Sequence, residues 1–422
     1  MAQPTRILLA LILGLLLGLV GAAAVPRGVT SVAIAVAEPI GGLWLDALHM
    51  TIVPLVVALL VTGIATTAEA ARAGRLAWRA LLLFLAVLWT SSVLGALLLP
   101  LFVEIWPLPA ASGQALRASL GTIGPAGDVP GIAEFLRSIV PTNPFAAAAN
   151  DAILPLIVFT TIFGFAITRL PAEPRERLTG FFSAVADAML VVIGWVLWAG
   201  PVGVFALAFV VAAHAGTAAL GALVHYVIAV SAVGAAIWLL AYPLARFGAG
   251  IRFGDFARAV APAQALGIST QSSLASLPPM LAGAERLGVP VHAAGVVLPL
   301  AVALFRATGP AMNLAVALYV AYWFGIELGP LQIAAGIAAA AITTMGSVSL
   351  PGQVSFITSI APIALAMGVP IEPLGLLIAV EVIPDIMRTV GNVSMDVAVT
   401  AIAARGEEEL AGEERKTDGV AP

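Results

Sequence analysis

Long runs of apolar residues constrain this chain more than any other feature. The runs lie near residues 7–25, 40–67, 80–103, 141–168, 180–213 and 219–246. About 20 mostly apolar residues are enough for a helix to cross the hydrocarbon core of a bilayer. Hydrophobic residues make up 61% of the chain and charged residues only 10%, so a soluble enzyme is excluded. We expect an all-α polytopic membrane protein, because a β-barrel would show strict alternation of apolar and polar residues.

The composition also excludes several kinds of site. Cysteine is absent, and the four histidines, His49, His214, His225 and His292, lie far apart. Disulfides, thiolate metal sites and cysteine nucleophiles are therefore excluded, and no histidine spacing typical of a metal site is present. The intramembrane residues show no nucleophile–base pair. We therefore expect no enzymatic activity, no organic cofactor and no nucleic-acid partner.

The distribution of arginine predicts the orientation of the chain. Arginines cluster near residues 72–79, 169–177 and 246–258, and six spans before residue 255 put these loops on the side of Arg6. Basic loops stay in the cytoplasm. We therefore expect a multi-pass protein of the inner (plasma) membrane with both termini cytoplasmic, and an external segment at 104–140.

Two later segments, 255–285 and 333–366, are only moderately apolar. Each is interrupted in the middle by Ser, Pro and Gly, as SSLASLPP at 272–279 and as TTMGSVSLPG at 343–352. Unpaired backbone groups are costly in lipid, so a broken helix survives only inside protein or beside a water-filled cavity. Two such segments indicate the binding site of a transporter. The alternative is that both are ordinary spans kinked by proline.

A polar stripe runs along the apolar segment 371–404. Its members are Glu381, Asp385, Arg388, Asn392 and Asp396, at spacings that put all of them on one helical face. Charged residues at mid-membrane are costly and usually functional. Arg388 suits a carboxylate and Asp385 an ammonium, so a zwitterion with an extra carboxylate would fit. The alternative is an internal salt-bridge network in which Arg388 neutralises Asp385.

Five segments in this order resemble the dicarboxylate/amino acid:cation symporter family, the glutamate transporter homologues. They are AEPIGGLWLDALHMTIVPLVVALLVTGI (38–64), IVPTNPFAAAANDAILPLIVFTTIFGFAIT (139–168), SSLASLPP (272–279), GSVSLPG (346–352) and PDIMRTVGNVSMD (384–396). The resemblance implies eight transmembrane helices and two oppositely oriented re-entrant hairpins, built as inverted repeats. It also implies a homotrimer in membrane lipid, with transport domains that move like elevators.

The same resemblance divides the chain into parts. Residues 1–73 would form scaffold helices one and two, and 74–103 would form helix three of the transport domain. Residues 104–216 would contain the external loop and scaffold helices four and five. The rest of the transport domain would occupy 217–404, and 405–422 would be a disordered cytoplasmic tail.

The resemblance also implies site residues. Arg388 would bind the side-chain carboxylate of the substrate and Asp385 its amino group. The other substrate-binding residues would be Ser272 and Ser273 of the first hairpin, Leu350 and Gly352 of the second hairpin, which gates the site, and Thr389 and Asn392. Asp396 and the carbonyl of Asn392 would bind a cation.

The chain departs from the family at one motif. Where the family has Asn-Met-Asp-Gly-Thr, this chain has Phe305, Arg306, Ala307, Thr308 and Gly309. The change removes a carboxylate and adds a guanidinium, and hard cations need oxygen ligands. The sodium sites built on this segment therefore lose their side-chain ligands. A sodium site made of backbone carbonyls, near Ala303, Thr344, Met345 and Ser347, stays open.

We therefore predict that Arg306 acts as a tethered cation near Asp396 or Glu381 and replaces at least one sodium ion. Coupling would then be sodium-independent, driven by protons with Glu381 as their carrier, or transport would run as exchange. The alternative is that Arg306 points to a helix end or to lipid headgroups, or makes a purely structural pair.

The function that follows is secondary transport of aspartate or glutamate. One alternative is a carrier of C4-dicarboxylates or neutral amino acids, although Asp385 disfavours the former and Arg388 the latter. Another alternative is an anion channel, or a sensor that binds substrate without transporting it.

Overall fold

The computed structural model describes residues 3–72, 74–109, 137, 139–150, 152–346 and 352–417. Every regular element in these ranges is a helix, which confirms the all-α fold class. Helices are the expected outcome, because each satisfies its own backbone hydrogen bonds within an apolar environment.

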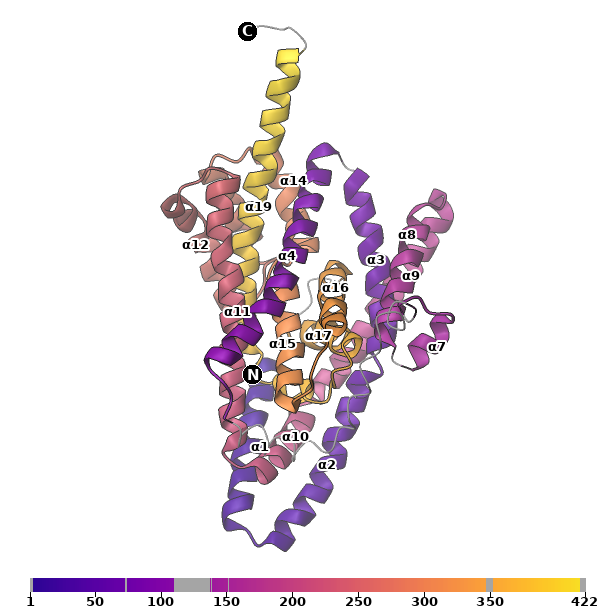
Figure 1. Cartoon of the computed structure of the whole chain (residues 1–422), viewed down its shortest axis with the longest axis vertical. Helices are drawn as coiled ribbons and strands as arrows, with labels where there is room; N and C mark the ends of the chain where they lie inside the picture. Colours follow the sequence, from indigo (N-terminus) through magenta and orange to yellow (C-terminus); the bar gives the residue numbers. More distant parts are fainter. Residues whose placement is uncertain are drawn as a thin grey trace.

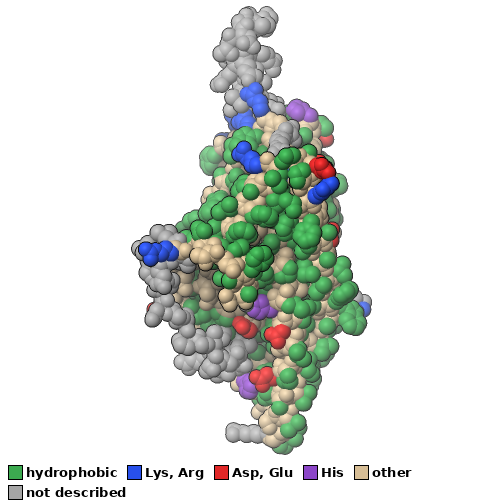
Figure 2. Space-filling model, turned by 90° about the vertical axis from the view of Figure 1, so that its right-hand side faces the viewer, with side chains coloured by type: hydrophobic (Ala, Val, Ile, Leu, Met, Phe, Trp, Pro, Cys, Tyr) green, Lys and Arg blue, Asp and Glu red, His purple; other side chains and the backbone are tan. Residues whose placement is uncertain are grey.

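Six segments of the described residues are long and apolar enough to cross a membrane. They are Thr5–Ala24, Gly28–Ala71, Arg75–Ile105, Ala172–Trp198, Leu220–Gly248 and Val291–Phe324. Figure 2 shows a face on which hydrophobic side chains are far more numerous than charged ones among the described residues. Large apolar side chains such as Leu97, Phe181 and Trp195 are exposed. A surface of this kind is suited to lipid and not to water.

One group of helices lies at the lower end and along the right of Figure 1. It consists of α1 (Gln3–Ala24), α2 (Arg27–His49), α3 (Ile52–Arg72), α7 (Pro144–Ala149), α8 (Ile153–Thr168), α9 (Ala172–Trp198) and α10 (Gly200–Ala215). In this group α10 packs along α1 and α2, and α3 packs against α8 and α9.

The remaining helices form a second group. It consists of α4 (Arg75–Ile105), α11 (Ala218–Gly248), α12 (Phe253–Thr270), α13 (Leu277–Arg286), α14 (Val291–Leu304), α15 (Gly309–Phe324), α16 (Pro330–Gly346), α17 (Gly352–Ala366), α18 (Leu374–Leu377) and α19 (Val382–Thr417). Here α15 lies at the centre, buried on nearly all sides, and packs against α4, α11, α16 and α17. These two groups have the membership expected of a scaffold and a transport domain; that division stays a prediction.

Two of the predicted spans are broken by proline. The run 40–67 contains the end of α2 and the start of α3, and the run 180–213 contains the end of α9 and all but the last residues of α10. Pro54 and Pro201 lie just after these breaks. A proline ring clashes with the carbonyl four residues earlier and has no N–H to donate, so neither helix continues through.

Each of the two broken segments forms a pair of short helices. In the first pair α12 packs against α13, and in the second α16 packs against α17. This arrangement is the one expected for helical hairpins; their re-entry into a membrane stays a prediction.

The helix α19 extends beyond the rest of the molecule at the top of Figure 1. It continues to Thr417, so residues 405–417 are helical, whereas a disordered tail is expected over 405–422. This segment is rich in Glu and Ala, which are strong helix formers, and it follows an established helix that needs no new nucleus.

Candidate functional site

The five residues of the predicted polar stripe lie in α19 or directly before it. Glu381 precedes the helix, and the N–H of Asp385 donates to its carbonyl at 2.9 Å, so the helical turn includes both. Glu381 is 1% exposed and Asp396 is not exposed at all. The stripe therefore faces the interior of the second helix group and not the lipid.

Arg388 is the centre of an ion-pair cluster. Its Nη1 lies 2.6 Å from Oε1 of Glu381 and 2.9 Å from Oδ1 of Asp385. Its Nη2 donates to Oδ1 of Asn313 in α15, at 3.4 Å. Asp385 thus has a partner within the protein, as the alternative of an internal salt-bridge network predicts, and a bound ammonium would have to compete with Arg388 for it.

Tyr226 of α11 connects a further helix to this cluster. Its hydroxyl donates to Oε2 of Glu381 at 3.0 Å, and the ring is fully buried. Glu381 therefore has Arg388 on one carboxylate oxygen and Tyr226 on the other, which fixes its orientation.

The departure from the family motif falls in the break between α14 and α15. The N–H of Thr308 donates to Oδ1 of Asn392 at 2.9 Å. The Thr308 hydroxyl lies 2.8 Å from the same oxygen and 2.9 Å from the carbonyl of Arg388, and can donate to either. Thr308 therefore ties the broken segment to α19 and occupies the side-chain oxygen of Asn392.

A small pocket opens beside this break. It is lined by Arg306, Gly309, Asn313, Thr344, Phe356, Ser359 and Arg388. Two of these side chains are guanidinium groups, and Gly309 is the first residue of α15, where the helix dipole is positive. Asn313, Thr344 and Ser359 add polar groups. The pocket is therefore suited to an anion.

Asp396 lies one helical turn beyond Asn392 and is completely buried. Neither of its carboxylate oxygens has a hydrogen-bond partner among the described residues. Arg306 lies close enough to act on its charge. A buried carboxylate in this state is expensive and suits a proton or a small cation.

The motif positions themselves do not fit a sodium ion bound by side chains. Phe305 is buried and stacks on Phe84, with ring centroids 4.6 Å apart. Ala307 has no side-chain oxygen, and its carbonyl accepts a hydrogen bond from the hydroxyl of Ser91. In the part of the chain that the structure describes, no group of three or more His, Asp or Glu side chains could hold a metal ion.

Other predicted residues lie away from the pocket lining. The Ser272 hydroxyl accepts from the N–H of Ala275 in the α12–α13 turn, which also contains Ser273. The Thr389 hydroxyl donates to the carbonyl of Asp385, and Ala303 is exposed on α14.

The predicted residues of the second hairpin are only partly described. Thr344 lines the pocket, Met345 lies in the last turn of α16, and Gly352 begins α17. Ser347 and Leu350 lie outside the described residues.

Four polar residues of the site were not predicted as site residues by sequence analysis: Tyr226, Thr308, Asn313 and Ser359. Asn313 and Tyr226 each stand inside an apolar run, and a polar group within a membrane helix is itself a signal. Their partners on α19 could not be read from spacing, because the contacts join different helices.

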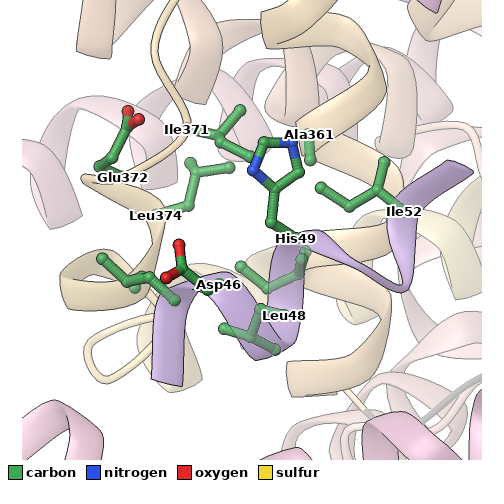
Figure 3. Close-up of a pocket in the computed structure, with 11 residues that line it drawn as sticks. Asp46, Leu48, His49, Ile52, Ala361, Ile371, Glu372 and Leu374 are labelled. Atoms are coloured by element: carbon green, nitrogen blue, oxygen red, sulfur yellow. The ribbon is translucent and has the colours of Figure 1, made fainter. Parts of the chain in front are cut away.

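A second pocket lies between the two helix groups (Figure 3). It is lined by Leu45, Asp46, Leu48, His49, Ile52, Ile357, Ala361, Ile371, Glu372, Leu374 and Gly375. Figure 3 shows the His49 ring directed toward Ile371 and Ala361, with Asp46 and Glu372 at the other side of the pocket. None of the sequence-predicted site residues that the structure describes lines it.

Residues 4–406 match the sodium:dicarboxylate symporter family. The chain is 28% identical over 376 residues to a proton/glutamate-aspartate symporter of Escherichia coli (strain K12), covering 88% of this chain and 85% of the relative. It is 27% identical over 412 residues to a proton/sodium-glutamate symport protein of Bacillus subtilis (strain 168), covering 96% and 92%. A C4-dicarboxylate transport protein of Rhizobium etli is 27% identical over 385 residues, covering 88% and 84%.

Proposed function

The chain belongs to the sodium:dicarboxylate symporter family, and on this premise we propose that it is a secondary active transporter of aspartate or glutamate. It is a multi-pass inner-membrane protein and a symporter of the dicarboxylate and amino-acid class, not an enzyme. The observation that carries the proposal is the position of Arg388 on the pocket wall while it is paired with Asp385. An amino acid with a second carboxylate needs these two opposite charges side by side.

Substrate binding would proceed by exchange of ion pairs. The substrate carboxylate would take the guanidinium of Arg388, and the released carboxylate of Asp385 would take the substrate ammonium. Glu381 would hold Arg388 in place, because its own second oxygen is fixed by Tyr226. The charges of Arg388, Asp385 and Glu381 would then be paired both with and without substrate, which avoids the large cost of an uncompensated buried charge in this cluster.

Coupling would rest on protons rather than on the usual sodium sites. Phe305 and Ala307 offer no side-chain oxygen, and Arg306 adds a fixed positive charge near Asp396. We propose that Arg306 replaces at least one sodium ion and that Glu381 carries the coupled proton, with exchange as the alternative. A sodium site formed by backbone carbonyls near Thr344 remains compatible with this scheme.

A second candidate function is transport of C4-dicarboxylates. The observation that favours it is that Arg306 and Arg388 line the same pocket. Two guanidiniums can each bind one carboxylate of a substrate without an amino group. In that case Asp385 would stay paired with Arg388 and would not meet the substrate.

We propose an elevator arrangement, because the two helix groups contain the helices expected of a scaffold and of a transport domain. The helices expected in the scaffold contact each other, as do those expected in the transport domain, and the pocket of Figure 3 lies on the boundary between them. The tip of the second hairpin, with Leu350 and Gly352, would gate the substrate pocket, and three copies would assemble through their scaffolds.

Uptake into proteoliposomes tests the proposal. Radiolabelled aspartate, glutamate and succinate are offered with a proton gradient or a sodium gradient imposed separately. We expect aspartate or glutamate to accumulate with the proton gradient alone. Succinate accumulation without amino-acid uptake would favour the second candidate. Binding without accumulation of any substrate would overturn transport and indicate a sensor.

A further inference from the structure

A histidine outside the substrate pocket is bonded at both ring nitrogens. His225 lies in α11 and is only 3% exposed. Its Nε2 is 2.6 Å from the carbonyl oxygen of Trp106, just after α4. Its Nδ1 is 2.8 Å from the hydroxyl of Tyr319 in α15. The ring therefore joins three separate elements of the second helix group.

These contacts fix the tautomer of the neutral ring. A carbonyl oxygen only accepts hydrogen bonds, so Nε2 must carry the hydrogen that bonds Trp106. In a neutral imidazole the other nitrogen is then an acceptor. The hydroxyl of Tyr319 therefore donates to Nδ1 of His225.

The same site can also accommodate the charged ring. The hydroxyl of Tyr319 lies 3.2 Å from the carbonyl oxygen of Ala222, one turn before His225. When Nδ1 takes up a proton, it donates to the Tyr319 oxygen, and the Tyr319 hydrogen turns to Ala222. Every donor has an acceptor in both states, so protonation leaves no buried polar group unpaired.

Three aromatic rings pack around His225. The ring centroid of Trp106 is 4.8 Å from that of His225, and those of Phe102 and Tyr319 are 6.2 and 5.6 Å away. Trp106 is itself 44% exposed, so one neighbour of the buried ring reaches the surface.

The histidine is also connected to the charged cluster. The next residue, Tyr226, donates to Glu381, and its ring meets that of Tyr319 edge-on with centroids 5.4 Å apart. The titratable groups facing this site are thus Tyr319 and Tyr322 from α15, Tyr226 from α11, and Glu381 with Arg388 beyond Tyr226. His225 and Tyr226 are neighbours in α11, and through Tyr226 the histidine site is adjacent to the Glu381–Arg388 pair.

We propose that His225 is a proton-binding site distinct from the substrate pocket, and that its charge is transmitted through Tyr319 and Tyr226 to the Glu381–Arg388 pair. Protonation of His225 changes which way the Tyr319 hydroxyl points and adds a positive charge next to Tyr226. The substrate pocket then responds to the pH at the Trp106 end of the molecule. This site goes beyond the proposed coupling at Glu381 and does not depend on which substrate is carried.

The first test follows the ring itself. Purified protein in lipid nanodiscs is labelled with ¹⁵N-histidine, and the signals of His225 are assigned with His225→Gln and followed from pH 5 to 8. We expect conversion from the neutral Nε2–H form to the doubly protonated form. Tyr319→Phe removes the acceptor of the Nδ1 hydrogen and should weaken proton binding about tenfold.

The exposed His214 of α10 gives the matched control. His214→Gln should leave the His225 signals unchanged. A His225 ring that stays neutral over the whole range would overturn the proposal, whatever substrate the protein binds.

The second test measures transmission. Glutamate affinity is determined at pH 5.5 and 7.5 for the parent, His225→Gln and Tyr226→Phe, with succinate used if glutamate does not bind. A Gln can donate to Trp106 and accept from Tyr319, but it cannot take up a proton. We expect a change of about fivefold between the two pH values in the parent, which His225→Gln reduces.

Tyr226→Phe separates binding of the proton from its effect. It should leave the NMR titration of His225 in place and reduce the change in affinity with pH. Identical pH profiles for the parent and His225→Gln would contradict transmission. Failure of both substrates to bind would count against the proposed function and leave the ring titration to decide on the proton site.

Discussion

The contact between α1 and α10 and the contact between α11, α15 and α19 hold helices together by different means. Along α1, Gly14 and Gly18 let the backbone of α10 approach closely. A Cβ on either glycine would lie 2.6 Å from the carbonyl oxygen of Phe205 or 2.5 Å from that of Phe209. Small residues at such contacts drive association in lipid by close packing.

The other contact depends on buried polar groups. Glu381 bridges α11 and α19 through Tyr226 and Arg388, and Thr308 and Asn313 connect the region of α15 to the same stripe. The comparison shows that two helices of this protein can pack together without charged groups. The costly buried charges are concentrated where a ligand could exchange partners with them, which is the argument for a functional site there.

The largest effect is expected when the charged contact is broken at its centre. Arg388→Ala leaves Glu381 and Asp385 buried without their cation, and it should weaken binding of an acidic substrate by about 2–5 kcal/mol. Calorimetric titration with aspartate measures this. Arg388→Lys is the control, since it keeps the charge without the planar fork. Parent-like affinity in Arg388→Ala would remove Arg388 from the substrate site.

A smaller effect is expected in the small-residue contact, and only on stability. Gly18→Ala pushes a methyl group against α10 and should lower the free energy of unfolding by about 1–3 kcal/mol, with unchanged substrate affinity. Thermal unfolding in detergent measures the loss. Gly28→Ala in α2 is a matched control, because a Cβ there meets no atom within 4 Å. Equal unfolding temperatures for the two variants would contradict the close contact.

The next prediction concerns Arg306, whose positive charge is proposed to replace a sodium ion at the charged contact. Binding to the parent should not change in a sodium titration with choline as the replacement ion. Arg306→Met should bind about tenfold more weakly without sodium, about 1.4 kcal/mol, and recover part of the loss as sodium is added. Strong sodium dependence in the parent would rule out a tethered cation. So would an Arg306→Met variant that binds normally and gains no sodium requirement.

The smallest effect is expected at Thr308. Thr308→Val keeps the N–H bond to Asn392 and removes the hydroxyl bond, so the free energy of unfolding should fall by about 0.5–1.5 kcal/mol. Thermal unfolding measures it, and Thr308→Ser, which keeps the hydroxyl, should lose less. A loss in Thr308→Ser as large as in Thr308→Val would show that the methyl packing of Thr308 matters and the hydroxyl bond does not.

The helical class and the stripe on α19 could be predicted because both are local. Apolar run length decides whether a segment can span, and the spacing from Glu381 to Asp396 fixes a common face. The breaks at Pro54 and Pro201 were missed because apolar composition continues across them. The pairing of Thr308 with Asn392 and of Tyr226 with Glu381 depends on how separate helices meet, which no periodicity contains. His225 was set aside for lack of a metal spacing, whereas its partners are a carbonyl and a phenol from other helices.

The buried charges around Arg306 and Arg388 have a consequence for membrane voltage. When all are ionised, these two guanidiniums face the three carboxylates of Glu381, Asp385 and Asp396, which leaves one net negative charge. A membrane potential of about 100 mV acts on one elementary charge with about 2.3 kcal/mol. If the helix group crosses the membrane as proposed, an inside-negative potential drives the empty carrier toward the outer face. An acidic amino acid with one net negative charge and a single coupled proton together add no net charge, so the loaded carrier keeps this bias. Uptake of a second proton would release the inward step from the electric field.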